Sequence, residues 1–214
     1  MSEQGTVGGP GGTDESVKPV VTLWEQYGAG AEEIGQEVAK SLGLPFHAQA
    51  FSSDDLEHPE ASLENRAVLT TVLGTMGGAY GGFEGRDIVT TQQERRDLIT
   101  TNNVTVRQSA QEGGVIIGRN ATVILADRPR TLHVLLTGEV KDRVERAAAA
   151  AGISVAQATK RQAREDDVRA EMSKVLYGWN PHEPDHYDLV LNTSRIPAAA
   201  AVSAIVNAIR ATIS

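Results

Sequence analysis

The 214-residue chain contains no cysteine, and this absence removes several kinds of chemistry at once. Disulfide bonds, thiolate catalysis and cysteine-ligated zinc are all excluded. Aromatic residues make up only 4% of the chain, so we expect a core built from aliphatic side chains, which suits an α/β protein. No apolar run reaches the roughly 18 residues that a membrane-spanning helix needs. No basic and apolar leader is visible either, and the expected location is the cytoplasm.

Basic residues are also few relative to acidic ones, and the net charge is -8 at pH 7. This balance argues against broad binding to nucleic acids or to anionic membranes. Eight of the twenty lysines and arginines nevertheless lie between positions 141 and 174. Acidic residues alternate with them, so a solvated, salt-bridged helix surface accounts for most of this local cluster.

The order of apolar segments predicts the domain organisation. Residues 1–18 are polar and glycine-rich and predict a flexible tail, whereas 19–214 predict a single domain. Short apolar runs that suit buried parallel strands lie at 20–23, 114–118, 132–136 and 187–191, and a shorter one begins at 44–46. Helical patterns separate these runs. The chain is therefore predicted to be an α/β protein with a parallel sheet covered on both faces.

A glycine-rich turn follows the first predicted strand. Residues 28–35 read Gly-Ala-Gly-Ala-Glu-Glu-Ile-Gly and open a helical pattern. A strand, a glycine-rich turn and a helix together direct backbone N–H groups and the positive end of the helix toward a phosphate. The lysine and Ser/Thr of the motif G-x-x-x-x-G-K-[ST] are absent. Ala31 occupies the lysine position, and Glu32 and Glu33 follow it.

A second glycine-rich region interrupts the alternation of strands and helices. Six of the twelve residues from 74 to 85 are glycine, which disfavours a helix by roughly 1 kcal/mol per glycine relative to alanine. A mobile loop near a substrate site is one interpretation. An irregular connection, or a surface for subunit contact in a homo-oligomer, is an equally good one.

Three stretches, taken together and in order, resemble the cytidylate kinase-like proteins, relatives of the nucleoside monophosphate kinases. Residues 26–35 are similar to the family pattern E-Y-G-S-G-G-R-E-I-G, and residues 115–121 with 127–129 are similar to V-I-V-G-R-C-A followed by D-R-P. The third stretch runs from Arg143-Val-Glu-Arg through Gly152 and Arg169 to the segment Tyr-Asp-Leu-Val-Leu-Asn-Thr-Ser at 187–194. The resemblance implies a P-loop kinase-type parallel sheet flanked by helices, with an arginine-containing helical lid at about residues 152–182.

The resemblance also implies an activity, namely ATP-dependent phosphoryl transfer to a nucleoside monophosphate or a similar small phosphate acceptor, and the missing loop lysine predicts that this activity is weak. Such transfer depends on positioning and on neutralising phosphate charge. Arg119 would bind the acceptor phosphate, since it follows a buried strand at the edge where α/β folds bind ligands. Arg143 would also contact phosphate. The residues implied to cradle the nucleotide are Gly28, Ala29, Gly30, Ala31, Glu32 and Glu33.

Two lid arginines, Arg161 and Arg164, are implied to close over the transferring phosphates as catalytic groups. Glu165 lies four residues from both Arg161 and Arg169, so local ion pairs compete with that role. Arg164 has no acidic residue at either four-residue neighbour and is the better candidate. Arg143 likewise has a local partner in Glu139, which leaves its functional role open.

Glu33 matches the family pattern, and its carboxylate is a candidate ligand for the Mg²⁺ that would accompany ATP. Complementing the helix dipole explains Glu32 and Glu33 equally well. The missing lysine also leaves a second function open, namely a non-catalytic nucleotide-sensing or protein-binding module that retains the fold.

Overall fold

The structure is a computed structural model that describes residues 16–51, 53, 55 and 88–213. Most of the predicted tail at 1–18 and all of the glycine-rich stretch at 74–85 lie outside the described residues, so the interpretations of both stay predictions. Within the described ranges, no helix combines the length and the apolar character needed to cross a membrane.

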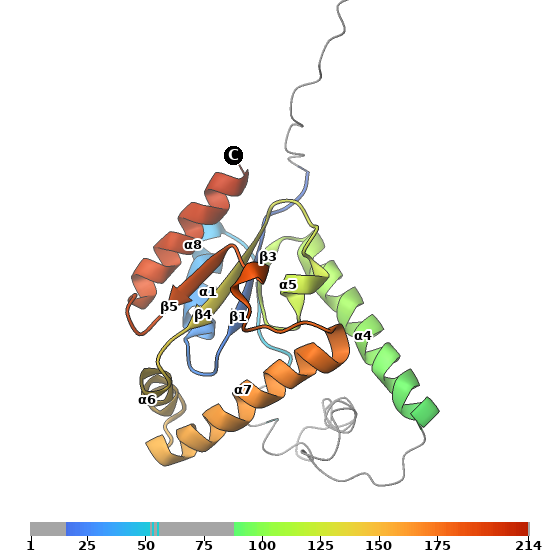
Figure 1. The fold of residues 1–214 in the computed structure, drawn as a ribbon. Helices are drawn as coiled ribbons and strands as arrows, with labels where there is room; N and C mark the ends of the chain where they lie inside the picture. Colours follow the sequence, from blue (N-terminus) through green and yellow to red (C-terminus); the bar gives the residue numbers. More distant parts are fainter. Residues whose placement is uncertain (1–15, 52, 54, 56–87, 214) are drawn as a thin grey trace, which may run out of the picture.

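One parallel sheet forms the centre of the molecule, with the strand order β2-β3-β1-β4-β5 (Figure 1). Its strands are β1 Val20–Glu25, β2 Phe46–His47, β3 Gly114–Ile117, β4 Thr131–Thr137 and β5 Leu189–Asn192. Every residue of β3 and all but the last of β1 are buried, which explains why both sequences are mostly apolar, with Thr22 the one buried polar residue. The predicted strand segments are thus confirmed, with small shifts at their ends.

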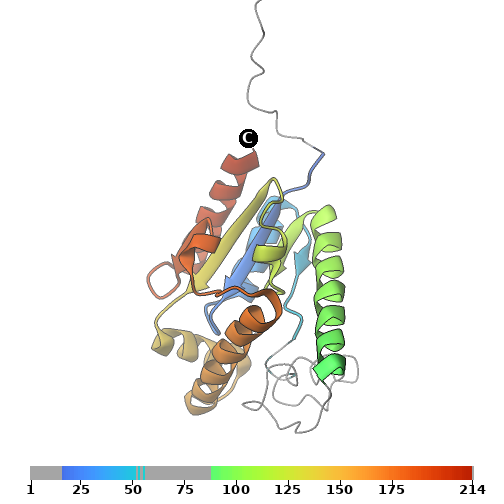
Figure 2. The ribbon, with the colours of Figure 1, turned by 45° about the vertical axis from the view of Figure 1, so that its right-hand side comes forward.

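Helices cover both faces of this sheet, as Figures 1 and 2 show. Helix α1 (Ala31–Leu42) and helix α8 (Ala198–Ile213) pack on one face and, with the strands, form the largest apolar cluster. Helix α4 (Ile88–Gln111) and the short α5 (Ala121–Ile124) lie on the other face. These layers confirm the predicted P-loop kinase-type α/β fold.

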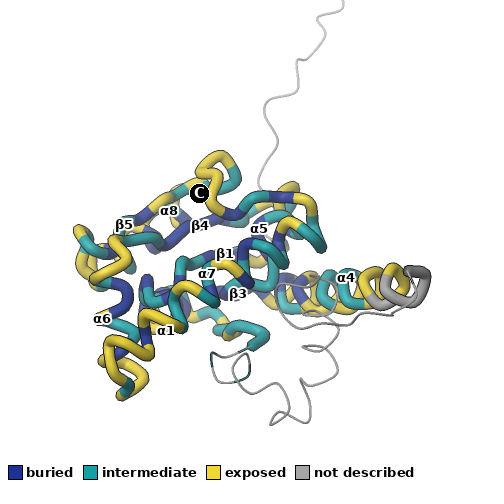
Figure 3. The backbone as a smooth tube through the Cα atoms, turned by 60° about the horizontal axis from the view of Figure 1, so that its bottom comes forward, coloured by how far each residue is buried: buried dark blue, intermediate teal, exposed yellow. Residues whose placement is uncertain are grey.

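Two further helices lie below the carboxyl ends of the strands. Helix α6 (Val140–Ala151) ends at a left-handed glycine, and α7 (Val155–Tyr177) begins with a capping box of Ser154 and Gln157. Helix α7 crosses in front of β1 and β3 in Figure 3. A one-turn 3-10 helix, η1 (Pro184–His186), then leads into β5. Helix α7 therefore occupies the edge where α/β folds bind ligands, which is the place expected for the lid.

Gly28 shows how closely α6 packs against the glycine-rich loop. Its φ of +76° is left-handed, and a Cβ there would overlap the carbonyl oxygen of Arg143. We expect Gly28→Ala to lower the free energy of unfolding by about 2–5 kcal/mol, since it combines left-handed strain with overpacking. Gly43→Ala is the control, because Gly43 has a φ of +65° and no atom within 4 Å of an added Cβ. Chemical denaturation measures both variants. If Gly28→Ala and Gly43→Ala lower the free energy of unfolding equally, the close contact between Gly28 and Arg143 is contradicted.

Candidate functional site

The candidate site lies at the carboxyl edge of the sheet, where three neighbouring strands end. Leu23 of β1 pairs with Ile117 of β3, so Glu25 and Arg119, each two residues further on, leave the sheet at the same edge. Gln49 follows the end of β2 on the other side of β3. Its amide nitrogen donates to Oε1 of Glu25 at 3.3 Å. The topology thus brings an acid, an amide and an arginine from three segments to one place.

Two N–H groups of the glycine-rich loop are occupied by the protein's own carboxylates. The N–H of Ala31, at the start of α1, donates to Oε2 of Glu25 at 2.9 Å. The N–H of Tyr27 donates to Oδ1 of Asp166 on α7 at 2.7 Å. A carboxylate is an anionic acceptor, as a phosphate is, and charge-assisted hydrogen bonds of this kind are strong. In this structure Glu25 therefore takes the position that an anion would take at the start of α1.

Two arginines of α6 hold the carbonyl groups of the same loop. Arg143 Nη1 donates to the Tyr27 carbonyl at 2.8 Å and to Oδ2 of Asp166 at 3.0 Å. Arg146 Nη1 donates to the Gly28 carbonyl at 2.6 Å. The Arg143 side chain is only 3% exposed, so a direct contact with a ligand phosphate would require these bonds to break. Its charged partner is the distant Asp166, whereas the sequence predicted Glu139.

A third arginine joins α7 to the end of β1. Arg169 Nη2 donates to Oε2 of Glu165 at 2.7 Å, which confirms that predicted pair, and its Nη1 lies 3.6 Å from Oε1 of Glu25. One guanidinium therefore serves two carboxylates. Burial raises the pKa of Glu165, against the opposing effects of Arg169 and of a hydrogen bond from Ser53, and nearby Glu25 raises it further. A negatively charged ligand at this position would therefore compete with Glu165 and Glu25 for the Arg169 guanidinium.

The predicted cradle residues fall into two groups. Ala29 and Ala31 are completely buried and belong to the main apolar cluster, and Gly30 has a φ of +93° at the N-cap of α1. The side chains of Glu32 and Glu33 are exposed on the first turn of the helix. Glu32 accepts a hydrogen bond from the side chain of Gln36, one turn further along α1. Only the backbone of this segment is therefore placed to surround a phosphate.

Arg119 is half-buried beside the end of β2. Its Nε donates to the Ala48 carbonyl at 3.2 Å, whereas its two Nη groups form no hydrogen bond with the described residues. Partial burial lowers the pKa of the guanidinium, which still carries its charge at neutral pH. Arg119 thus offers a cation at the edge where the sequence predicted an acceptor site.

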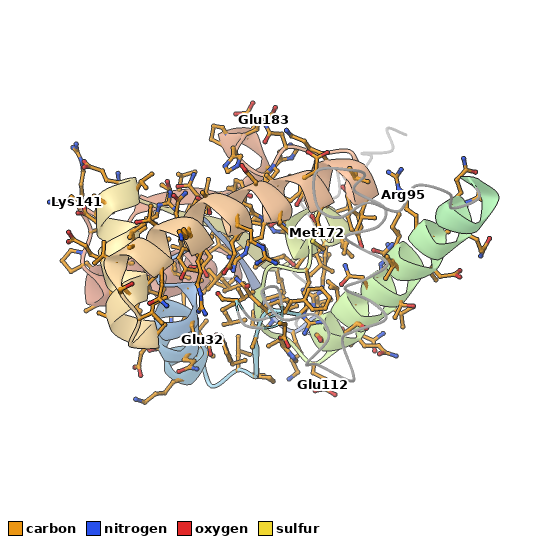
Figure 4. All side chains as sticks on the ribbon, turned by 90° about the horizontal axis from the view of Figure 1, so that it is seen from below. Glu32, Arg95, Glu112, Lys141, Met172 and Glu183 are labelled. Carbon is orange, nitrogen blue, oxygen red and sulfur yellow. The ribbon has the colours of Figure 1, made fainter. Side chains whose placement is uncertain are left out.

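The two predicted catalytic arginines lie on α7, which spans the face shown in Figure 4 and carries Met172 toward its C-terminal end. Arg161 and Arg164 are both half-buried. Arg164 forms no ion pair with another described residue, in keeping with the absence of an acid four residues away. Their role in phosphoryl transfer stays a prediction.

The fold and the residues at the carboxyl edge of the sheet are consistent with the family that the sequence resembles. The family model described as "Cytidylate kinase-like family" matches residues 20–195. The chain belongs to the cytidylate kinase-like family. The match begins at β1, includes the glycine-rich loop and α7, and ends just after β5, so it covers every element of the candidate site. The resemblance identified from the three sequence stretches is thus confirmed.

Two individual relatives are similar in sequence to this chain, and one of them is named a cytidylate kinase. The chain is 36% identical over 185 residues to a Corynebacterium glutamicum protein described as a uronate isomerase, in a match covering 85% of this chain and 34% of that protein. It is 36% identical over 98 residues to the cytidylate kinase of Methanopyrus kandleri, covering 42% of this chain and 51% of that enzyme. The chain thus spans about a third and about half of these relatives.

A solved structure shows the same fold. The crystal structure of an uncharacterised protein from Eubacterium ventriosum superposes with a TM-score of 0.59 at 16% identity, covering 91% of this chain and 99% of that one. At this level of identity the likeness concerns the fold alone.

The sequence did not single out Glu25, Arg146 or Asp166. A signal for Glu25 was present, because an acidic residue at the end of the first buried strand must lie beside the glycine-rich turn. Arg146 and Asp166 looked like ordinary members of a salt-bridged helix surface. Their contacts with the loop span more than 100 residues of chain and could not be found from local spacing.

Proposed function

We propose that this chain is a cytidylate kinase-like phosphotransferase of weak activity, whose phosphate loop is closed by its own carboxylates. The donor would be ATP, and the acceptor a nucleoside monophosphate or a similar small phosphorylated molecule. The observation that carries the proposal is the hydrogen bond from the Ala31 N–H to Oε2 of Glu25. This bond supports an anion site at the start of α1, as phosphate binding requires, with the Glu25 carboxylate as the acceptor in this structure.

The residues at the sheet edge have distinct roles in this proposal. The backbone of residues 28–33 surrounds the donor phosphates once Glu25 has moved aside. Arg119 binds the acceptor phosphate through its Nη groups, and Arg161 and Arg164 approach the transferring group from α7. When Mg²⁺ accompanies the nucleotide, it neutralises phosphate charge, and protein sites usually supply only one or two carboxylates for it. The exposed carboxylate of Glu33 fits that limited role.

The missing lysine sets the expected rate. Removing one preorganised charge-stabilising group costs about 100–1,000-fold in rate. Typical kinases turn over at about 1–100 s⁻¹, so transfer here is expected to be lower by roughly that factor. Glu25 adds electrostatic repulsion to this loss wherever it remains beside a bound phosphate.

One observation favours a second candidate, a non-catalytic module that keeps the fold. Three arginines beside the loop are engaged inside the protein, where Arg143 and Arg146 bind loop carbonyls and Arg169 pairs with Glu165. If they do not exchange these partners for phosphate, the loop serves only as a structural turn between β1 and α1.

A calorimetric titration with ATP and with CMP, each with and without Mg²⁺, tests the proposal. We expect CMP to bind, ATP to bind more tightly with Mg²⁺ than without it, and ADP to form slowly when both are present. Arg119→Ala is expected to weaken CMP binding by about 1.5–3 kcal/mol, the value of a hydrogen bond to a charged group, with little change in thermal stability. Absence of binding for both nucleotides, or binding without any formation of ADP, would overturn the proposal in favour of the non-catalytic module.

A further inference from the structure

The backbone that carries Arg119 is strained. Gly118, Arg119 and Asn120 have φ values of +64°, +56° and +54°, so three successive residues adopt the left-handed conformation. Residues with a Cβ are disfavoured there, and arginine more so than asparagine. Such conformations persist only where the surrounding structure fixes them. The contacts of this turn (residues 118–120) therefore show what holds Arg119 in place.

A side chain of α4 fixes the peptide group of Arg119. Nδ2 of Asn102 donates to the Arg119 carbonyl at 2.7 Å and to the hydroxyl of Tyr177 at 2.7 Å. The Tyr177 hydroxyl in turn donates to Oδ1 of Asn103 at 3.2 Å. Both hydrogens of the Asn102 amide are thus used, and its orientation is determined from two sides.

The segment that follows α7 fixes the next residue. Nε1 of Trp179 donates to Oδ1 of Asn120 at 2.8 Å. Trp179 is 6% exposed and packs in an apolar cluster with Trp24 and Leu135. A buried indole has one donor and few conformations, so this bond fixes the Asn120 side chain in one position.

Helix α7 also contacts the glycine-rich loop. Tyr177 is the last residue of α7, and Trp179 comes directly after its C-cap glycine. Three turns earlier, Asp166 of this helix accepts the hydrogen bond from the Tyr27 N–H. Helix α7 therefore contacts the glycine-rich loop near its middle, and Trp179, just beyond its C-terminal end, contacts the turn that carries Arg119.

We propose that Asn102 and Trp179 are positioning residues, which hold the turn at residues 118–120 and thereby set where the Arg119 guanidinium meets an acceptor phosphate. The inference rests on the proposed function in one respect, the role of Arg119 in acceptor binding. The positioning of the turn itself follows from the strained backbone and from the hydrogen bonds to the Arg119 carbonyl and the Asn120 side chain.

Trp179→Phe tests this inference, because it removes the N–H donor and keeps an aromatic ring in the cluster. The matched control is Tyr187→Phe, which removes a hydroxyl from the same cluster that donates to the Pro181 carbonyl and does not touch the turn. Two readouts are used. One is CMP affinity by calorimetry, and the other is the hydrogen exchange rate of the Ala121 N–H, which is bonded to the Gly118 carbonyl at 3.0 Å.

We expect Trp179→Phe to weaken CMP binding about threefold to tenfold, the effect of losing one hydrogen bond, and to speed exchange at Ala121 by a similar factor. Asn102→Ala is expected to do the same, whereas Tyr187→Phe changes neither readout by as much as twofold. Unchanged exchange in Trp179→Phe and Asn102→Ala would overturn the inference. If the wild-type chain binds no CMP, the proposed function fails, while the exchange rates still decide whether these side chains position the turn.

Discussion

Replacing Arg143 with methionine is expected to lower the free energy of unfolding by about 3–5 kcal/mol. The Arg143 guanidinium is buried, binds the carbonyls of Tyr27 and Gly138, and pairs with Asp166. Methionine keeps much of the apolar volume but leaves the mostly buried Asp166 carboxylate without this cation. Breaking a buried pair by removing one partner is costly for that reason.

Urea denaturation of Arg143→Met measures this effect, and Lys141→Met is its control. Lys141 lies on the same helix and carries the same charge, but its side chain is 81% exposed and its ion pair with Glu145 is 4.0 Å long. The control is expected to change stability by less than about 0.5 kcal/mol. A loss below about 1 kcal/mol for Arg143→Met would show that its bonds to the loop add little, and a phosphate-binding role would then become the better explanation.

Replacing Glu25 with glutamine is expected to raise ATP affinity about tenfold or more. Two like charges 4 Å apart repel by about 4 kcal/mol at the effective dielectric constant of a protein surface. Even a part of that repulsion, about 1.5 kcal/mol, corresponds to a tenfold change in affinity. Glutamine has nearly the same shape, and its carbonyl oxygen can still accept the Ala31 hydrogen bond. The neutral bond is weaker, so a phosphate displaces it more easily.

Restoring a lysine at position 31 is the change that the P-loop motif suggests, and the structure argues against it. Ala31 is completely buried in the main apolar cluster, where a lysine stem would displace core side chains. Glu32, the other departure in the loop, is exposed and bonded to Gln36. Glu25, which the motif does not include, is the carboxylate that contacts the start of α1.

The architecture was largely predictable because it depends on local patterns. The runs Val20–Leu23 and Gly114–Ile117 are apolar apart from Thr22, as is typical of strands buried on both faces, and both lie in central strands of the sheet. Ser154 and Gln157 likewise identify the start of α7, since a capping box requires only two residues three positions apart.

The contacts of the site were not predictable, because they are long-range. Spacing rules paired Arg143 with Glu139 on the same helix, whereas Asp166 of α7 supplies the actual partner. Those rules describe exposed helix surfaces, but here α6 and α7 pack together against a loop and bury Arg143 and most of Asp166. Similarly, no local sequence pattern near Arg119 predicts that Asn102 and Trp179 fix the turn at residues 118–120.

Calorimetric titration of Mg²⁺-ATP into wild type, Glu25→Gln and Glu37→Gln tests most directly the claim that a carboxylate closes the phosphate loop. Glu37→Gln removes the same charge from the exposed side of α1, where Lys40 is the partner of Glu37 among the described residues. We expect Glu25→Gln to bind ATP at least about tenfold more tightly than wild type, and Glu37→Gln to stay within about twofold of it. If all three proteins are folded and bind ATP equally, or if none binds it, Glu25 does not control a phosphate site and the account is wrong.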